Sequence, residues 1–296
     1  MIFLIAKYWG CHMFEKVLLP NILNNLSRYK TDIIKEYQDG LYKYPGDGTI
    51  RKLPYILPKI DNHFKNTKNI LSGIRTDFLN SNYKNIKPHV YFNHLNSSQA
   101  MCINFFYPLT KNNLLNHVLS RIKINEPIDY SEVKFEKDSN IENTGRKTNF
   151  DFYIKTKNNT NIYFEIKYTE RSFGSAKNDI AHTRKFNADY LPKLSSVPHV
   201  NKKYHSMNLF FKNYQIMRNI LNIDVNSYVV IIYLKENEKL RMKCEEVKNE
   251  IILGPLTNHF LDIDWHDMFK WVYDSIGNNK DLVRYYDDFH NKYLAY

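Results

Sequence analysis

The stretch from Thr148 to Thr169 constrains the fold more than any other part of the sequence. It reads TNFDFYIKTKNNTNIYFEIKYT, in which bulky apolar residues alternate with polar ones in two short runs. Alternation with a period of two is typical of half-buried strands, and the polar residues 157–160 between the runs indicate a turn. The sequence therefore predicts a β-hairpin.

The alternation also restricts how the two strands of this hairpin can pair. In the first strand the even-numbered apolar residues, including Phe150, share one face, and the odd-numbered residues, including Asp151, share the other. The apolar face is expected to pack on the core. A slip of one residue would bury the charges, so Asp151 must lie opposite an odd-numbered partner. A three-residue turn at residues 157–159 makes that partner Glu165, with Lys167 further along the same face. The Cβ atoms of Asp151 and Glu165 would then be about 4.5–5.5 Å apart.

Two carboxylates at that separation need a counter-ion, because like charges repel and raise one pKa. A divalent metal removes the conflict, and Mg²⁺ is commonly held by one or two carboxylates, waters and phosphate oxygens. This face therefore suits phosphodiester hydrolysis, in which Lys167 would orient or deprotonate the attacking water or offset phosphorane charge. The alternative is an ordinary solvated sheet face. Carboxylates of Asp151 and Glu165 close enough to share a metal, with Lys167 beside them in an open basic cleft, would favour hydrolysis. A larger separation, or a buried face, would favour the alternative.

The spacing of these residues resembles the PD-(D/E)XK nuclease superfamily, which has the restriction-endonuclease-like fold. After Asp151 and thirteen intervening residues comes Glu165-Ile166-Lys167, where the family has E-x-K, and Phe150 stands where it usually has proline. The resemblance covers roughly residues 95–234. It implies an α/β fold with an α-β-β-β-α-β core, a three-layer arrangement in which helices flank a mixed sheet. It also implies that Asp151 and Glu165 bind Mg²⁺, with Mn²⁺ as a substitute, and that Lys167 is catalytic.

Several further polar residues are candidates for the same site. Glu132 and Glu136, on a strand predicted over residues 129–136, would each add a carboxylate if they are more than exposed strand charges, and Glu132 is the candidate third metal ligand. Gln215 resembles polar residues that some branches of the superfamily place near the scissile phosphate, which makes it a catalytic candidate. Gln99 either caps a helix or reaches the metal. The cations expected to hold phosphates are Lys177, Arg184, Lys185, Lys212 and Arg218.

The rest of the chain predicts three parts. Residues 1–90 form a mostly helical extension, residues 91–235 the nuclease core, and residues 236–296 a helical C-terminal extension packed on that core. The first extension contains a turn-rich segment, residues 40–59, that predicts a loop or short hairpin.

Three segments of the core carry their own expectations. A helix that begins near residue 96 is expected to end at Pro108. Residues 191–204 contain two prolines and predict a loop, and the continuous apolar run 227–234 predicts a strand covered on both faces.

The charge of the chain favours a polyanionic partner. Lys and Arg number 42 against 31 Asp and Glu, a formal net charge of +11. Such a balance favours nucleic acid, most of all double-stranded DNA, although a lysine-rich composition alone would produce the same excess.

Other classes of protein lack support. The three cysteines, Cys11, Cys102 and Cys244, are widely spaced and are expected to be free thiols. The apolar start is too short for a signal peptide and no stretch is long enough for a membrane span, so a cytoplasmic protein is expected. Zinc, dinucleotide and serine-hydrolase motifs are absent from the sequence.

The sequence leaves several roles open. A restriction or phage-defence endonuclease is the leading interpretation, because of the family resemblance and because the sequence shows no helicase or ATPase motif beside the nuclease core. A repair or structure-specific nuclease and an RNase of the same fold are alternatives. A non-catalytic nucleic-acid-binding module is the alternative from another class. The resemblance is also compatible with a homodimer, which many such nucleases form.

Overall fold

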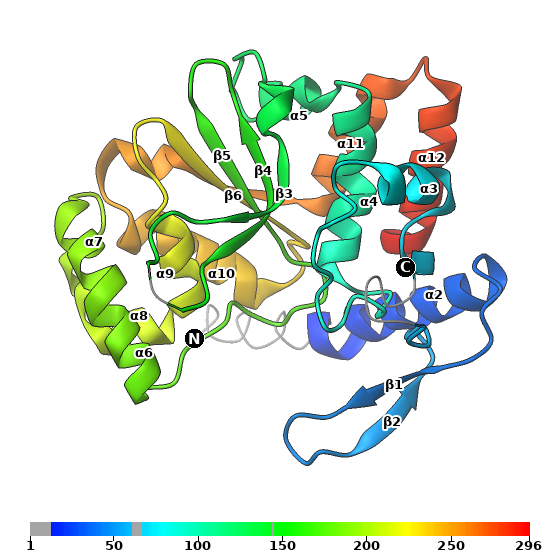
Figure 1. Ribbon diagram of the computed structural model, residues 1–296, viewed down its shortest axis with the longest axis horizontal. Coiled ribbons are helices and arrows are strands. Elements are labelled where there is room, and N and C mark those ends of the chain that lie inside the picture. The colour runs from blue at the N-terminus through cyan, green and yellow to red at the C-terminus, as the bar shows by residue number, and fades with distance from the viewer. Residues whose placement is uncertain (1–12, 61–66, 144) are drawn as a thin grey trace. The chain divides into compact units, whose positions relative to one another are not determined.

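The computed structural model describes residues 13–60, 67–143 and 145–296, which form two compact units (Figure 1). Unit 1 comprises the described residues up to Lys123 together with His266–Tyr296, and unit 2 comprises Ile124–Trp265. The helices of the C-terminal segment therefore belong to the same unit as the N-terminal segment. Expectations that concern residues 1–12, including Cys11, lie outside the described residues.

Unit 2 is built on a mixed five-stranded sheet in the order β3-β4-β5-β6-β7. The pairs β3–β4 and β4–β5 are antiparallel, whereas β5–β6 and β6–β7 are parallel. This is the α/β class that the sequence predicts, and the arrangement is compatible with the restriction-endonuclease-like fold. The strands are β3 (Lys134–Asp138), β4 (Asn149–Lys155), β5 (Asn161–Ile166), β6 (Ser227–Tyr233) and β7 (Phe260–Asp264).

The apolar run 227–234 forms β6, as predicted. It lies between β5 and β7 in the sheet, and Val229 to Ile232 are all fully buried, so both of its faces are covered. The neighbouring strand β7 was not expected, because the sequence Phe-Leu-Asp-Ile-Asp is short and carries two acidic residues.

One face of the sheet packs against the helices of unit 2. Val229 and Ile231 of β6 share a buried cluster with Ile216 and Met217 of α9 and with Leu240 of α10. The helices are α6 (Ile180–Lys185), α7 (Leu191–Ser196), α8 (Met207–Lys212), α9 (Tyr214–Ile220) and α10 (Glu238–Glu246), with short turns at Tyr130–Glu132, Phe186–Tyr190, Lys202–His205, Val247–Ile251 and Gly254–His259.

The loop predicted over residues 191–204 is wrong in its first half. The chain runs from α6 through the turn Phe186–Tyr190 directly into α7. Pro192 lies in the first turn of α7, directly after the π-helical turn Phe186–Tyr190, so the helical backbone continues past this proline.

Unit 1 consists of helices and a separate hairpin. Its helices are α2 (Leu19–Asp32), α3 (Ser72–Asn80), α4 (Ser98–Lys111), α5 (Leu115–Arg121), α11 (Trp265–Ile276) and α12 (Lys280–Tyr293), with short turns at Phe14–Leu18 and Thr67–Asn69. The turn-rich segment forms the hairpin β1 (Gly40–Lys43) and β2 (Ile50–Leu53). None of the described helices combines the length and apolarity needed to cross a membrane.

Helix α4 continues through Pro108, contrary to the prediction that it ends there. A proline leaves the carbonyl four residues earlier without its helical donor. In α4 this is the carbonyl of Asn104, and it accepts a hydrogen bond of 2.6 Å from the hydroxyl of Tyr285 on α12. A tertiary contact therefore compensates for the lost helical bond.

Candidate active site

The pairing of β4 places Asp151 between two acidic residues of neighbouring strands. Strand β4 pairs with β5 from Phe152↔Phe164 to Lys155↔Asn161, which is the predicted register, and the next opposed residues are Asp151 and Glu165. On its other side β4 pairs with β3, and Glu136 is the residue opposite Asp151. Neither ladder includes Asp151 itself.

The backbone is distorted around Asp151. Its Oδ2 accepts the N–H of Ile166 at 2.6 Å, so the side chain replaces a backbone partner where the ladder ends. Glu136 has a φ of 55°, a left-handed conformation that non-glycine residues rarely adopt. The ring of Phe150 packs 4.6 Å from that of Tyr163, so strict alternation, which predicted Phe150 on the opposite face, breaks down here. Strain of this kind is often found at functional sites.

Helix α9 and Lys167 fix the carboxylate of Glu165. Its Oε1 accepts hydrogen bonds from Gln215 Nε2 at 2.8 Å and is 2.9 Å from Lys167 Nζ. Its Oε2 accepts a longer bond of 3.3 Å from Asn219 Nδ2. Gln215 also accepts the N–H of Gly174 at 2.9 Å, so it joins α9, the loop after β5 and Glu165. Both amides therefore act as positioning groups for this carboxylate.

Asp151, Glu165 and Lys167 are buried, with 8%, 5% and 6% of their surface exposed. The open cleft expected for hydrolysis is therefore not found among the described side chains, and this burial by itself favours the non-catalytic alternative. The backbone of Lys167 is held on both sides, because its N–H donates to Ile232 at 2.8 Å and its carbonyl accepts from Trp265 Nε1 at 3.0 Å.

The charges of the site perturb one another strongly. Burial raises the pKa of Asp151 well above its usual value, and the carboxylates of Glu165 and Glu136 raise it further. Burial by itself would lower the pKa of Lys167, but the carboxylates of Glu165, Glu170 and Asp151 outweigh it and raise that pKa. The ammonium of Lys167 is thus close to several carboxylates, and Glu165 and Glu136 repel the carboxylate of Asp151.

This imbalance fits a hard divalent cation. The donors around Asp151 are carboxylate oxygens, which are the ligands that Mg²⁺ prefers. The Oδ1 atom of Asn219 is buried and has no hydrogen-bond partner among the described residues. Asp151 and Glu165 are the residues that would hold such an ion, with Glu136 as a further carboxylate beside Asp151.

A comparison with family models decides the family. The model of the family described as "Restriction Endonuclease associating with ARP" matches residues 29–294. The chain belongs to this family. It is therefore a restriction-type nuclease with a nucleic-acid substrate, and the resemblance inferred from Asp151, Glu165 and Lys167 is confirmed at the level of the family. Comparisons with curated proteins and with solved structures give no match.

Within this restriction-endonuclease family member, Glu136 rather than Glu132 lies beside Asp151. Glu132 belongs to the short turn before β3, and its carboxylate is 2.7 Å from Lys134 Nζ. Lys134 is paired with Tyr153, so Glu132 lies beyond that pair, away from Asp151. The prediction of Glu132 as third ligand is corrected for this reason. The strand begins at Lys134 instead of residue 129, and the sequence carries no signal for that shift.

Asn219 was missed by the sequence analysis, although a signal existed. It follows Gln215 by one helical turn, and residues at this spacing lie on the same face of a helix. Both amides bond to Glu165. Once Gln215 is taken as a candidate, helical periodicity alone would have included Asn219.

The cations predicted to hold phosphates fall into two groups in the nuclease. Lys177, Arg184 and Lys212 are exposed. Lys185 donates to the carbonyl of Arg146, and Arg218 Nε lies 3.3 Å from Oε1 of the buried Glu142, so both have partners within the protein. Phosphate binding stays a prediction for all five.

Gln99 has neither of the roles considered for it. The N-cap of α4 is Ser97, whose hydroxyl accepts from the N–H of Ala100. The buried amide of Gln99 accepts the N–H of His89 at 2.7 Å and donates to the carbonyl of Lys87 at 3.1 Å. It supports the loop that precedes the helix.

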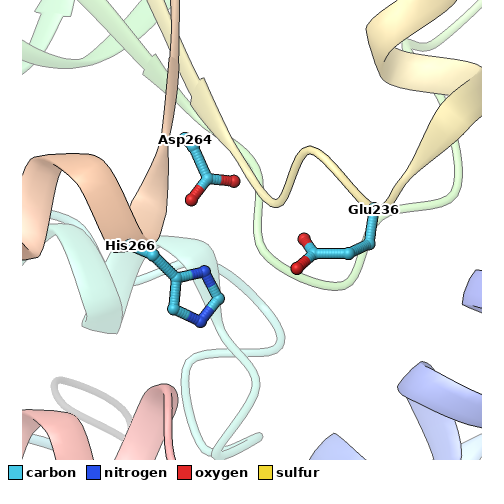
Figure 2. Close-up of side chains that lie close together, drawn as sticks. All are labelled: Glu236, Asp264 and His266. Atoms are coloured by element: carbon cyan, nitrogen blue, oxygen red, sulfur yellow. The ribbon is translucent and has the colours of Figure 1, made fainter.

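A second pair of carboxylates in the nuclease lies at the C-terminal edge of the sheet, with Asp264 the last residue of β7 and Glu236 in the loop after β6 (Figure 2). Oxygens of Glu236 and Asp264 are within 4.8 Å of each other, and His266 follows Asp264 by two residues. Asp264 accepts the N–H of Lys235 at 2.8 Å. This bond gives Asp264 a structural role in holding the loop after β6.

Proposed function

We propose that the protein is a Mg²⁺-dependent endonuclease that hydrolyses phosphodiester bonds of double-stranded DNA, with a cytoplasmic role in restriction or phage defence. The observation that carries the proposal is the group around Asp151. Two further carboxylates, Glu165 and Glu136, flank it on neighbouring strands, and Lys167 lies 2.9 Å from Glu165. Family membership supports the nuclease, and the carboxylate set supports the metal.

Each residue of the site has a chemical part in this proposal. Asp151 and Glu165 hold the cation, and a bound Mg²⁺ supplies Lewis acidity at the phosphate and lowers the pKa of a bound water. Lys167, whose Nζ lies 2.9 Å from Glu165, orients or deprotonates the attacking water or offsets phosphorane charge. Gln215 and Asn219 orient Glu165 through the bonds from α9.

Cleavage of plasmid and linear duplex DNA in Mg²⁺, and separately in Mn²⁺, tests the proposal. We expect Asp151→Asn and Glu165→Gln each to reduce the rate by roughly a thousandfold, since each removes a charge needed in the transition state. Glu132→Gln and Glu136→Gln form a matched pair. The first should cleave at the wild-type rate and the second more slowly, because only Glu136 lies opposite Asp151. Cleavage that survives both Asp151→Asn and Glu165→Gln would refute the assignment.

The nature of the substrate requires a second assay. A panel of duplex, single-stranded and branched DNA, together with RNA, separates a restriction nuclease from repair nucleases and RNases. We expect the duplex to be cut fastest. Binding with a steep salt dependence but no metal-dependent product on any member would instead indicate a non-catalytic module.

A further inference from the structure

The hairpin β1–β2 of unit 1 is an ordered ribbon that the active site does not use. Its ladder runs from Gly40↔Leu53 to Lys43↔Ile50. Beyond the ladder, the backbone N–H of Tyr44 donates to the carbonyl of Thr49 at 2.8 Å. The N–H of Gly48 donates to the carbonyl of Tyr44 at 2.9 Å and closes the turn. Figure 1 shows the hairpin extending away from the helices of unit 1.

The base of the ribbon is anchored in the core of unit 1. Ile56 and Leu57, which follow β2, are fully buried. The N–H of Gly40 donates to Ile56 at 2.8 Å, and that of Leu57 donates to Asn93 at 2.9 Å. A Cβ atom at Gly40 would overlap Ile56 and the carbonyl of Leu57, so only glycine permits this close approach.

One face of the ribbon is filled by its own aromatic side chains. Tyr42 lies 4.8 Å from Tyr44 and 5.5 Å from His94, measured between ring centroids. The guanidinium of Arg51, which pairs with Tyr42 in the ladder, lies 4.9 Å above the ring of Tyr44. These contacts stiffen the ribbon.

The opposite face, which we call the ribbon face, carries Leu41, Lys43, Ile50 and Lys52. Leu41 pairs with Lys52 and Lys43 with Ile50, and residues directly opposed in a ladder share a face. All four are exposed, Leu41 at 55% and Ile50 at 62%. Aliphatic and ammonium side chains therefore alternate on a surface that stays exposed among residues 13–60, 67–143 and 145–296.

The charge of the hairpin indicates the partner. Within residues 40–53 the basic residues are Lys43, Arg51 and Lys52, and the one acidic residue, Asp47, accepts hydrogen bonds from the N–H and hydroxyl of Thr49. The major groove of duplex DNA, about 12 Å wide, admits a two-stranded ribbon. Ammonium groups then reach phosphates, and aliphatic side chains meet apolar base edges such as the thymine methyl.

We infer that the ribbon face of β1–β2 docks in the major groove of duplex DNA. This inference rests on the proposed function, because it takes duplex DNA as the substrate. Binding by this surface needs no metal, so it can be measured separately from cleavage.

The test is the salt dependence of binding. The full chain is titrated onto a labelled linear DNA duplex in EDTA over a series of NaCl concentrations. Lys43→Ala/Lys52→Ala should lower the slope of log affinity against log salt by about 1.8, since each lost phosphate contact contributes about 0.9. Leu41→Ser/Ile50→Ser should weaken binding by roughly tenfold at every salt concentration with an unchanged slope, because it removes only apolar contact.

A matched control uses two exposed lysines of other elements of unit 1, Lys270 and Lys280. Lys270→Ala/Lys280→Ala removes the same charge and should leave the slope unchanged. An equal loss of slope in this control overturns the inference in favour of diffuse electrostatic attraction. If both ribbon variants keep the wild-type slope and affinity, the inference is also overturned, and the ribbon face would have to serve a protein partner instead of DNA.

The two proposals fail in distinguishable ways. If wild-type protein cleaves duplex DNA and the ribbon variants bind it as the wild type does, only the docking inference is refuted. If duplex binding depends on the ribbon face but no metal-dependent cleavage occurs, only the nuclease chemistry is refuted. Absence of any duplex binding by the wild type refutes the docking inference.

Discussion

Two buried lysines, Lys167 in unit 2 and Lys292 in unit 1, have pKa values shifted in opposite directions. Lys167 lies among carboxylates, which raise its pKa despite burial. Lys292 is fully buried and its Nζ donates to the backbone carbonyl and the Oδ1 of Asn69, at 2.7 and 2.8 Å. Burial lowers the pKa of Lys292 well below its usual value, and Asp288 opposes this only in part.

The difference shows what separates a reactive site from a buried polar contact of the core. Both amino groups are removed from water, but that of Lys292 meets the neutral oxygens of Asn69 and the rings of Tyr29 and Tyr293. Lys167 instead compensates Glu165 within a group of carboxylates that repel one another. The excess of negative charge, rather than burial, is what distinguishes the surroundings of Lys167 from those of Lys292, and it supports the cation site proposed there.

Replacing each lysine by methionine should give the largest difference between the two sites. Lys167→Met should slow DNA cleavage by about a hundredfold to a thousandfold, because it removes a cation from the reacting centre. It should also lower the free energy of unfolding by roughly 3 kcal/mol in metal-free buffer at pH 8, since buried carboxylates lose their partner. Cleavage kinetics and urea denaturation measure the two effects.

Lys292→Met serves as the matched control for that experiment. It should retain the wild-type cleavage rate and lose only about 1–3 kcal/mol, the penalty for unpaired buried acceptors at Asn69. Equal loss of activity in the two variants would contradict the distinction between a reactive and a structural lysine.

The pH dependence of stability sharpens the comparison further. The lowered pKa of Lys292 means that the unfolded chain binds a proton that the folded chain does not. The stability contributed by this group is therefore present above the ordinary lysine pKa, near 10.4, and is lost as the pH falls. From pH 9 to pH 7 the wild type should lose up to about 1.4 kcal/mol per pH unit relative to Lys292→Met. A difference independent of pH would mean that Lys292 stays charged when buried.

The smallest predicted effect concerns backbone strain beside Asp151. Glu136 has a φ of 55°, which favours glycine. Glu136→Gly and Glu136→Ala remove the same carboxylate, so their difference isolates the backbone. The glycine variant should be more stable by about 1 kcal/mol in urea denaturation. Equal stability would show that the left-handed conformation stores no strain.

The hairpin of the site could be predicted from the sequence because two local rules agree there. Alternation set the faces and the turn Lys157–Asn159 set the register, so Glu165 was correctly placed opposite Asp151. The continuous apolar run at Ser227 likewise predicted the interior strand β6. The alternation, the turn and the apolar run are all local patterns, contained in the residues of the elements that they predict.

Other features depend on contacts that the sequence does not display. Helix α4 passes Pro108, and the carbonyl of Asn104 that loses its helical donor accepts instead from Tyr285, far along the chain. Glu132 and Glu136 have the same parity on the predicted strand, so the alternation could not separate them. The observed start of β3 and its register do. The burial of Asp151 was also missed, since a charged residue on a strand is ordinarily taken to face solvent.

The central claim is that Asp151 and Glu165 together bind a divalent cation, and metal titration tests it most directly. Mn²⁺ binding to the full chain, followed by electron paramagnetic resonance and competed with Mg²⁺, should be weakened at least tenfold by Asp151→Asn and by Glu165→Gln. Glu132→Gln, which changes a carboxylate paired with Lys134, should bind as the wild type does. Mn²⁺ affinity that is unchanged in both Asp151→Asn and Glu165→Gln would contradict the account.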